Sequence, residues 1–149
     1  MATRALKTQD KESHSSLFTR YEKNFQHLQN IVLTAKNGVS ARAFFDVAAV
    51  SGIEKNKLAG LLNVSLKSLN RYRQQNKKLS PGKSERVLKL MKLYRKGEEI
   101  FGDVEPFRRW LEKPAIGLGW MIPFELLQTS GGIDLIMEEL IRIEFGDLA

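Results

Sequence analysis

The stretch KNKLAGLLNVSLKSLNRYRQ, residues Lys55 to Gln74, predicts one helix, a tight turn and a second helix. Apolar residues recur in both parts at the three-to-four-residue spacing of one helical face: Leu58, Leu61, Leu62, Leu69 and Tyr72. Asn63 occupies the turn, where the backbone usually needs a positive φ that Asn tolerates better than most residues. Ser65 is placed to cap the second helix, because its hydroxyl can accept a hydrogen bond from a first-turn amide. The pattern is that of a helix-turn-helix.

The outward face of the second predicted helix carries side chains that can hydrogen-bond base edges or phosphates. In a helix-turn-helix the N-terminal part of this helix enters the major groove, so Lys67, Ser68, Asn70 and Arg71 are expected near bases. Arg73 and flanking lysines are expected nearer phosphates. The full set of candidate DNA-binding residues is Ser65, Lys67, Ser68, Asn70, Arg71, Arg73 and Lys77. An ordinary helical hairpin with a solvated charged face would show the same local pattern.

Charge is distributed unevenly along the 149 residues. Residues 1–97 contain 20 Lys and Arg against 6 Asp and Glu, whereas residues 98–149 contain 4 against 11. Between Lys55 and Lys96 there are 13 basic residues and one acidic residue, Glu85. A solvated basic face could carry this excess, but its position around a helix-turn-helix favours DNA, which binds cations through counterion release. The acidic half is expected to have a different partner.

Several classes of protein are excluded by composition. There is no cysteine, which rules out disulfides and thiolate chemistry, and His14 and His27 form no ligand cluster, so we expect no metal and no cofactor. The sequence contains no Gly-rich phosphate loop and no paired carboxylates, which argues against an enzyme. The uncharged run Pro114 to Phe124 is 11 residues, too short to span a bilayer. We therefore expect a cytoplasmic protein without a membrane segment.

The periodicity predicts an all-α fold: a disordered N-terminus at residues 1–17, a basic helical domain at 18–97 containing the helix-turn-helix at 55–74, and an acidic helical domain at 98–149. The first domain should begin with one helix over residues 18–36, whose apolar face is either core or a dimerisation surface: Tyr21, Phe25, Leu28, Val32 and Ala35. The next helix is expected over Ala41 to Val50. A long helix should begin at Pro81 and stop at Gly97.

In the acidic half, Asp103 is expected to cap a short helix over Val104 to Glu112. The segment KPAIGLGWMIP that follows is expected to be a structured loop, since Pro and Gly break helices while its apolar residues need cover. Pro123 should open a further helix, and a last helix should run from Gly132 to Phe145.

Two runs resemble a known family: LSPGKSERVLKLMKLYRKGEEIFGD from Leu79, and FRRWLEKPAIGLGWMIPFELLQTSGGIDLIMEELIRIEFG from Phe107. They contain a Trp-Leu pair, a Leu-Gly pair, a Pro-x-Glu-Leu-Leu and a closing Leu-x-Arg-Ile-x-x-Gly, at Trp110-Leu111, Leu118-Gly119, Pro123 to Leu127 and Leu140 to Gly146. Behind a helix-turn-helix, this combination resembles the antitoxins of RES-domain toxin-antitoxin pairs, the Xre/ParS type, over residues 38–149.

The resemblance implies that the acidic half binds a cognate RES-domain toxin, an enzyme that consumes NAD or transfers from it, and blocks entry to its active site. It places the toxin contacts within Trp110 to Gly146 and the tail. Since the apolar residues there can equally be core, the exposed polar ones are the expected contacts: Glu138, Glu139, Arg142, Asp147, Leu148 and Ala149.

The sequence thus predicts an antitoxin that neutralises a RES-domain toxin and binds operator DNA to regulate its own operon. A homodimer is expected, because helix-turn-helix proteins commonly bind two half-sites. The alternative is a stand-alone regulator of the phage-repressor kind, whose C-terminal domain only dimerises or senses a ligand.

Overall fold

The computed structural model describes residues 17–146, and this part of the chain is helical without a strand, apart from one isolated β-bridge between Ser40 and Lys78. The elements follow in the order α2 (Glu22–Phe25), α3 (Leu28–Asn37), α4 (Arg42–Ser51), α5 (Lys55–Leu61), α6 (Leu66–Gln74), α7 (Pro81–Phe101), α8 (Val104–Leu111), two 3-10 turns η1 (Ile116–Leu118) and η2 (Pro123–Gln128), and α9 (Ser130–Glu144). The predicted all-α class is confirmed. No helix within 17–146 is long and apolar enough to cross a membrane.

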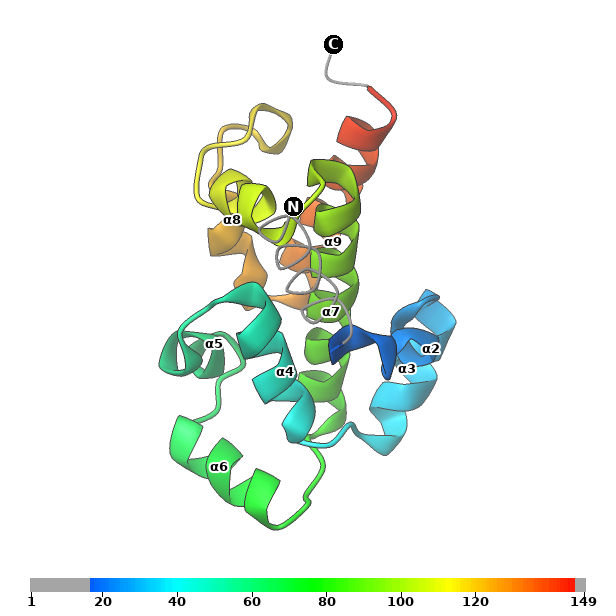
Figure 1. Cartoon of the computed structure of the whole chain (residues 1–149), viewed down its shortest axis with the longest axis vertical. Helices are drawn as coiled ribbons and strands as arrows, with labels where there is room; N and C mark the ends of the chain where they lie inside the picture. Colours follow the sequence, from blue (N-terminus) through cyan, green and yellow to red (C-terminus); the bar gives the residue numbers. More distant parts are fainter. Residues whose placement is uncertain (1–16, 147–149) are drawn as a thin grey trace, which may run out of the picture.

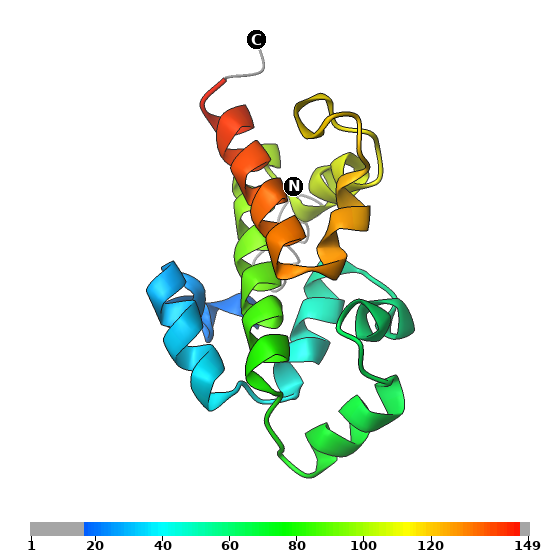
Figure 2. The same ribbon diagram turned by 180° about the vertical axis from the view of Figure 1, so that it is seen from behind.

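Helix α7 is the central element of the molecule. It has 21 residues, hence a length of about 30 Å at 1.5 Å per residue. Helices α2, α3, α4, α8 and α9 all pack against it (Figures 1 and 2). Its buried residues accordingly lie on several sides of the helix: Ser84, Val87, Leu88, Lys89, Leu90, Met91, Leu93, Tyr94 and Gly97. Because α7 runs through the predicted boundary at residues 97 and 98, any division there leaves one helix shared by both parts.

The N-terminal region differs from the single helix predicted over residues 18–36. The helix is interrupted at Gln26 and His27, and α2 and α3 are separate. On α3 the buried residues are Ile31 and Ala35, whereas Leu28 and Val32, which were expected on the inner face, are 59% and 55% exposed. The interruption shifts the phase of the second helix by breaking the regular 100° step, so the apolar stripe does not continue across it. The predicted disordered segment lies outside the described residues except for Leu17, which is half-buried against the core.

The helix-turn-helix forms as predicted, with α5 and α6 joined by a tight turn. Asn63 has a φ of 53° in that turn, and the side chain of Ser65 accepts a hydrogen bond of 3.0 Å from the amide of Ser68. Helix α5 has its own cap in Glu54, whose carboxylate accepts from the amides of Asn56 and Lys57. The hydrogen bond from Asn56 lowers the pKa of the Glu54 carboxyl below its ordinary value.

The segment between α6 and α7, residues 75–80, is tied to the stretch that precedes α4. The amide of Leu79 donates to the carbonyl of Val39, and the hydroxyl of buried Ser84 both accepts from the amide of Val39 and donates to the carbonyl of Leu79. These hydrogen bonds satisfy backbone amides and carbonyls that would otherwise be buried without partners. The segment that follows the C-terminal end of α6 is therefore fixed to the stretch before α4 and to α7.

In the C-terminal part, Asp103 caps α8 through a 2.7 Å hydrogen bond from the amide of Val104, as predicted. The segment opened by Pro123 is a 3-10 turn, and α9 begins two residues earlier than expected, with Thr129 as its cap. Ile133, Ile136 and Leu140 form the buried face of α9.

Gly97 does not end α7, as the sequence suggested, but lies inside the helix and is buried. A Cβ added there would collide with the ring of Phe107 on α8. Phe107 is fully buried among aromatic rings, with Tyr94 edge-on at 5.2 Å and Trp110 stacked at 6.0 Å. The glycine is thus needed for the close approach of two helices, and Gly102, with φ of 83°, ends α7 instead.

We predict that Gly97→Ala lowers the free energy of unfolding by about 1 to 3 kcal/mol, because the added methyl overpacks the Phe107 site. Urea unfolding followed by circular dichroism measures this change. Gly60→Ala is the matched control: Gly60 lies in α5 with open space around its Cα, so alanine should stabilise by roughly 0.5 to 1 kcal/mol. Equal effects of the two substitutions would contradict the packing role of Gly97.

Candidate nucleic-acid interface and C-terminal docking surface

The solvent face of α6 carries four of the side chains predicted to contact DNA. Leu69 is the one buried residue of this helix, and Lys67, Asn70 and Arg71 lie on the opposite side, with Lys67 and Arg71 exposed and Asn70 half-buried. Gln74 continues the same face and is exposed. Ser68 is half-buried and stands at the edge. The structure therefore brings Lys67, Asn70 and Arg71 together on one accessible surface.

Arg73 is on a different side of α6 from this surface. Its guanidinium lies over the ring of Phe45 on α4, at 3.9 Å from the ring centroid. A cation at this distance from an aromatic face is attracted by the ring quadrupole by about 0.5 to 1 kcal/mol. Arg73 thus secures α6 against α4, in addition to any phosphate contact it makes.

The serines at the start of α6 are engaged in capping. The hydroxyl of Ser65 donates to the hydroxyl of Ser68 at 2.8 Å, and the Ser68 amide donates back to Ser65. Beside them is an open groove of about 530 Å³, between α6 and the first turn of α7. Three lysines line it, Lys77, Lys78 and Lys83. Lys83 was not among the predicted DNA-binding residues, although its place after Ser80-Pro81 at a helix start was visible in the sequence.

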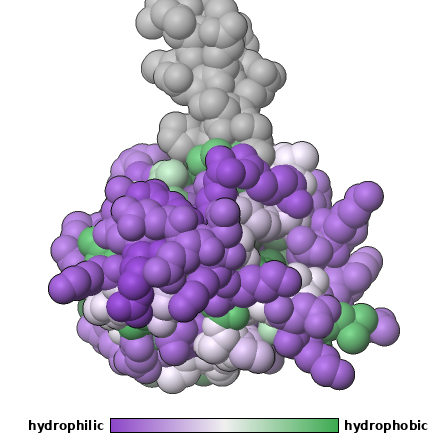
Figure 3. Space-filling model, turned by 90° about the horizontal axis from the view of Figure 1, so that it is seen from below, coloured by the Kyte–Doolittle hydropathy of each residue, from purple (hydrophilic) through white to green (hydrophobic). Residues whose placement is uncertain are grey.

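This end of the molecule is strongly hydrophilic. Figure 3, seen from below the view of Figure 1, shows hydrophilic residues covering most of the surface, with only scattered hydrophobic spots. Several basic residues of the 55–96 region do not contribute to it, since they contact other parts of the molecule. Lys57 lies over the ring of Phe124 at 4.4 Å, Lys96 pairs with Glu144 at 2.6 Å, and Lys89 is buried. The outward basic surface is therefore made by α6, the 75–80 link and the start of α7.

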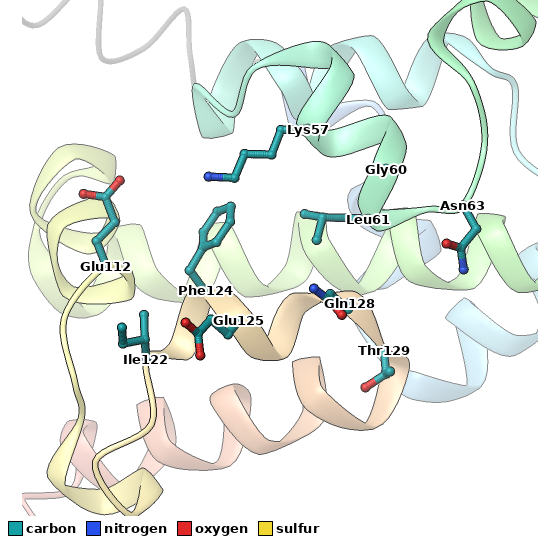
Figure 4. Close-up of a pocket in the computed structure, with 10 residues that line it drawn as sticks. All are labelled: Lys57, Gly60, Leu61, Asn63, Glu112, Ile122, Phe124, Glu125, Gln128 and Thr129. Atoms are coloured by element: carbon teal, nitrogen blue, oxygen red, sulfur yellow. The ribbon is translucent and has the colours of Figure 1, made fainter.

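Arg86 joins the helix-turn-helix to the C-terminal part. Its guanidinium donates to the carbonyls of Leu61 and Leu62, at the C-terminal end of α5, and to the carbonyl of Gln128 at the end of η2. A guanidinium suits this place because it carries five donors and a charge that favours the negative end of a helix. Beside it, a cleft of about 850 Å³ separates α5 from η2 (Figure 4). Lys57 reaches across this cleft to Phe124.

The opposite end of the molecule exposes large apolar side chains. Five of the nine exposed large hydrophobic residues in the described part of the chain lie here: Ile116, Trp120, Met121, Ile141 and Phe145. They belong to the loop that contains η1 and to the C-terminal end of α9, which lie at the end of α7 away from α6 (Figures 1 and 2). Exposed apolar groups of this size commonly mark a surface that binds another protein.

The charged residues predicted on α9 have different environments. Glu138 is exposed and Arg142 is half-buried, as expected of surface residues. Glu139 was expected to be exposed but is only 1% exposed, because the 100° step between neighbours turns it under the η1 loop. Its carboxylate accepts two hydrogen bonds from Arg142, at 2.6 and 2.9 Å. Asp147, Leu148 and Ala149 lie outside the described residues.

Within residues 17–146 no group of three or more His, Asp or Glu side chains is arranged to hold a metal ion.

Two family models match this chain, one over each of the segments that carry these surfaces. Residues 31–92 match the antitoxin Xre-like helix-turn-helix domain, and residues 96–146 match the antitoxin Xre/MbcA/ParS C-terminal toxin-binding domain. The chain belongs to the Xre-type antitoxins. The α6 surface lies in the first matched segment, and the exposed apolar end lies in the second. The resemblance to Xre/ParS-type antitoxins is confirmed, and so is the order of the helix-turn-helix and the C-terminal domain.

Individual antitoxins are similar to this one over most of their length. The chain is 29% identical to a Prs ADP-ribosylating antitoxin of Sphingobium sp. (strain YBL2), over 76% of this chain and 77% of the relative. It is 26% identical to antitoxin Xre of Yersinia enterocolitica serotype O:8, over 78% and 79%. Antitoxin Xre of Photorhabdus laumondii is 25% identical, over 62% of this chain and 63% of the relative.

Proposed function

We propose that this antitoxin neutralises a RES-domain toxin that consumes NAD, by covering the entrance to its active site, and that it binds operator DNA to regulate its own operon. The observation that carries the proposal is the placement of two chemically different surfaces at the two ends of α7. The α6 end is basic and hydrophilic, and the α9 end exposes large apolar groups. The two surfaces are separated by about 30 Å, the length of α7, so DNA and a toxin can be bound at the same time.

The choice of an NAD-consuming toxin rests on the resemblance and on one relative. The name of the Sphingobium protein refers to ADP-ribosylation, a reaction in which the ADP-ribosyl group comes from NAD. Such a toxin and the operon would both be met in the cytoplasm, which is where we place the antitoxin. Of the predicted contacts, Glu138, Arg142 and the tail residues Asp147, Leu148 and Ala149 would face the toxin directly, whereas Glu139 would act through Arg142.

The first test is co-expression with the product of the adjacent reading frame. We expect the two proteins to co-purify, and cellular NAD, measured by an enzymatic cycling assay, to fall only when the antitoxin is omitted. The control is the antitoxin expressed without the neighbour, which should leave cellular NAD unchanged. If nothing co-purifies and NAD stays constant, the toxin proposal fails and a stand-alone regulator becomes the better account.

Operator recognition is assigned to Asn70 and Arg71, which lie together on the accessible face of α6. An amide can bind adenine, and a guanidinium can bind guanine, through two hydrogen bonds each, which discriminates by about 1 to 3 kcal/mol. Lys77 and Lys83, beside the groove, are assigned to phosphates, which position the protein without reading sequence.

We predict that Asn70→Ala weakens binding to the DNA upstream of its own gene by about 1 to 3 kcal/mol while leaving binding to random DNA nearly unchanged. Lys83→Ala is the matched contrast, and it should weaken both by a similar factor and reduce the salt dependence of binding. Fluorescence anisotropy at two salt concentrations measures both effects. Equal losses on both DNAs for Asn70→Ala would mean that this residue contacts phosphate.

The homodimer is assigned to the exposed side of α3. Leu28, Val32 and Leu33 are each more than half exposed there, and Lys36 is the one charged residue of this ten-residue helix. Burying such a face against a second copy removes apolar surface from water with little charge to desolvate. A second copy is the fitting occupant, because a two-fold dimer would present two α6 helices to two half-sites.

We predict that Val32→Glu converts the protein to a monomer, because the carboxylate would be buried opposite its own copy. Sedimentation equilibrium measures the change, and the variant should remain folded since Val32 is 55% exposed. Gln26→Glu, which adds the same charge at an exposed position before α3, should leave the dimer intact. A dimer that survives Val32→Glu would place the interface elsewhere.

A further inference from the structure

The loop from Ala115 to Met121, called here the η1 loop, exposes apolar residues that ordinary folding would bury. Ile116 is 68% exposed, Trp120 66% and Met121 45%. Ala115 and Leu118 of the same loop are buried, so the loop has an inner side packed on the core and an outer side in water. Large apolar side chains that are exposed to solvent on a packed loop bring no stability to the isolated chain.

The η1 loop is closed on itself by backbone hydrogen bonds. The amide of Ala115 donates to the carbonyl of Met121 at 3.0 Å, and the amide of Trp120 donates to the carbonyl of Ala115 at 2.9 Å. The amide of Met121 in turn donates to the carbonyl of Leu118 at 3.2 Å. The loop therefore has a fixed shape before any partner binds, which reduces the conformational entropy lost on association.

Trp120 has a φ of 66°, in the left-handed region that residues with a side chain rarely adopt. A conformation of this kind costs about 1 to 3 kcal/mol and persists where the surroundings impose it, often at binding sites. Here it turns the indole outward into water. The strain and the exposure both concern the same residue, whose side chain offers a large contact area to a partner.

The η1 loop rests on a buried carboxylate. Gly117 packs directly against Glu139 of α9, since a Cβ on Gly117 would collide with both carboxylate oxygens. Arg142 holds that carboxylate with two hydrogen bonds to Oε2, while Oε1 is buried without a hydrogen-bond partner among the described residues. A buried, partly unsatisfied carboxylate is unfavourable for stability and calls for another reason to be present. Its position gives that reason, because Glu139 and Arg142 support the loop from beneath.

We propose that Ile116 and Trp120 are the main apolar contacts of this antitoxin with its toxin, and that Glu139 and Arg142 position them. The inference rests on the proposed function, in which the C-terminal half binds a toxin. The toxin presents an apolar pocket to the indole of Trp120 and to Ile116. Buried Trp residues at the centre of an interface commonly carry a large share of the binding free energy.

A toxin fits this surface better than a second copy of the chain. The η1 loop lies at the end of α7 away from α6 (Figures 1 and 2), within the segment matched to a toxin-binding domain. An end-to-end dimer through this loop would place the two α6 helices roughly 60 Å apart, twice the length of α7. Half-sites one turn apart need about 34 Å.

The test measures association and dissociation rates between the purified antitoxin and the purified product of the adjacent reading frame. We expect Trp120→Ala to weaken binding by about 30-fold or more, mainly through faster dissociation, with an unchanged thermal unfolding midpoint. Ile116→Ala should act in the same direction, and it provides a second variant should Trp120→Ala misfold. Gln26→Ala is the control, since Gln26 is exposed and lies outside the segment matched to the toxin-binding domain.

If both loop variants bind as tightly as the wild type, the proposal is overturned although the proposed function stands. If the wild type does not bind the neighbour at all, both fall together. Losses in the loop variants with little loss in Gln26→Ala support the proposal.

The positioning role has its own comparison. Gly117→Ala should displace the Glu139 carboxylate and weaken toxin binding although Ile116 and Trp120 are both retained. It should also speed amide hydrogen exchange at Trp120 in the free protein, because the loop loses its support. Gly131→Ala, in open space at the start of α9, should change neither measurement. Wild-type binding and exchange in Gly117→Ala would show that the carboxylate does not position the loop.

Discussion

The ammonium group of Lys89 is buried where α7 meets α9, and the position of the C-terminal half depends on it. Its nitrogen donates to Ser130 at 2.7 Å and to both carboxylate oxygens of Asp134 at 2.9 and 3.0 Å, and Glu85 lies 3.4 Å away. A buried charge is tolerated only when its partners are in place, so only one seating of α9 on α7 satisfies this group. The apolar contacts of α9 supply attraction, and Lys89 selects the register.

With α9 packed on α7, the helix α7 connects the basic α6 surface to the exposed apolar end, and the two surfaces share no residues. Its first turns flank α6 and the lysine-lined groove, and its last turns pack on α8 through Gly97 and Phe107. Arg86 spans the junction by bonding carbonyls from both sides. A displacement of η2 therefore bears on α5 through Arg86 and through Lys57, which lies over Phe124. The two ends of the molecule are linked by α7 and by these contacts.

Prediction from the sequence succeeded where the signal is local. The turn at Asn63, the cap at Ser65 and the cap at Asp103 each depend on residues within a few positions, so chain chemistry alone specifies them. Prediction was wrong where the outcome depends on how two elements pack against each other. Gly97 looks like a helix stop until Phe107 is seen against it, and Glu139 looks exposed until the η1 loop covers it. Both errors come from contacts between residues distant in the chain.

The sequence by itself determined the all-helical class, the helix-turn-helix, the opposite charge of the two halves and the resemblance to the antitoxin family, because these follow from periodicity, composition and motif spacing. Tertiary structure decided which basic residues remain outside. Lys89 and Lys96 form ion pairs within the molecule, whereas Lys67 and Arg71 are exposed. Helical periodicity cannot distinguish a paired basic residue from an exposed one. It also decided that Trp120 faces water, since burial depends on what packs against a loop rather than on the hydrophobicity of the loop itself.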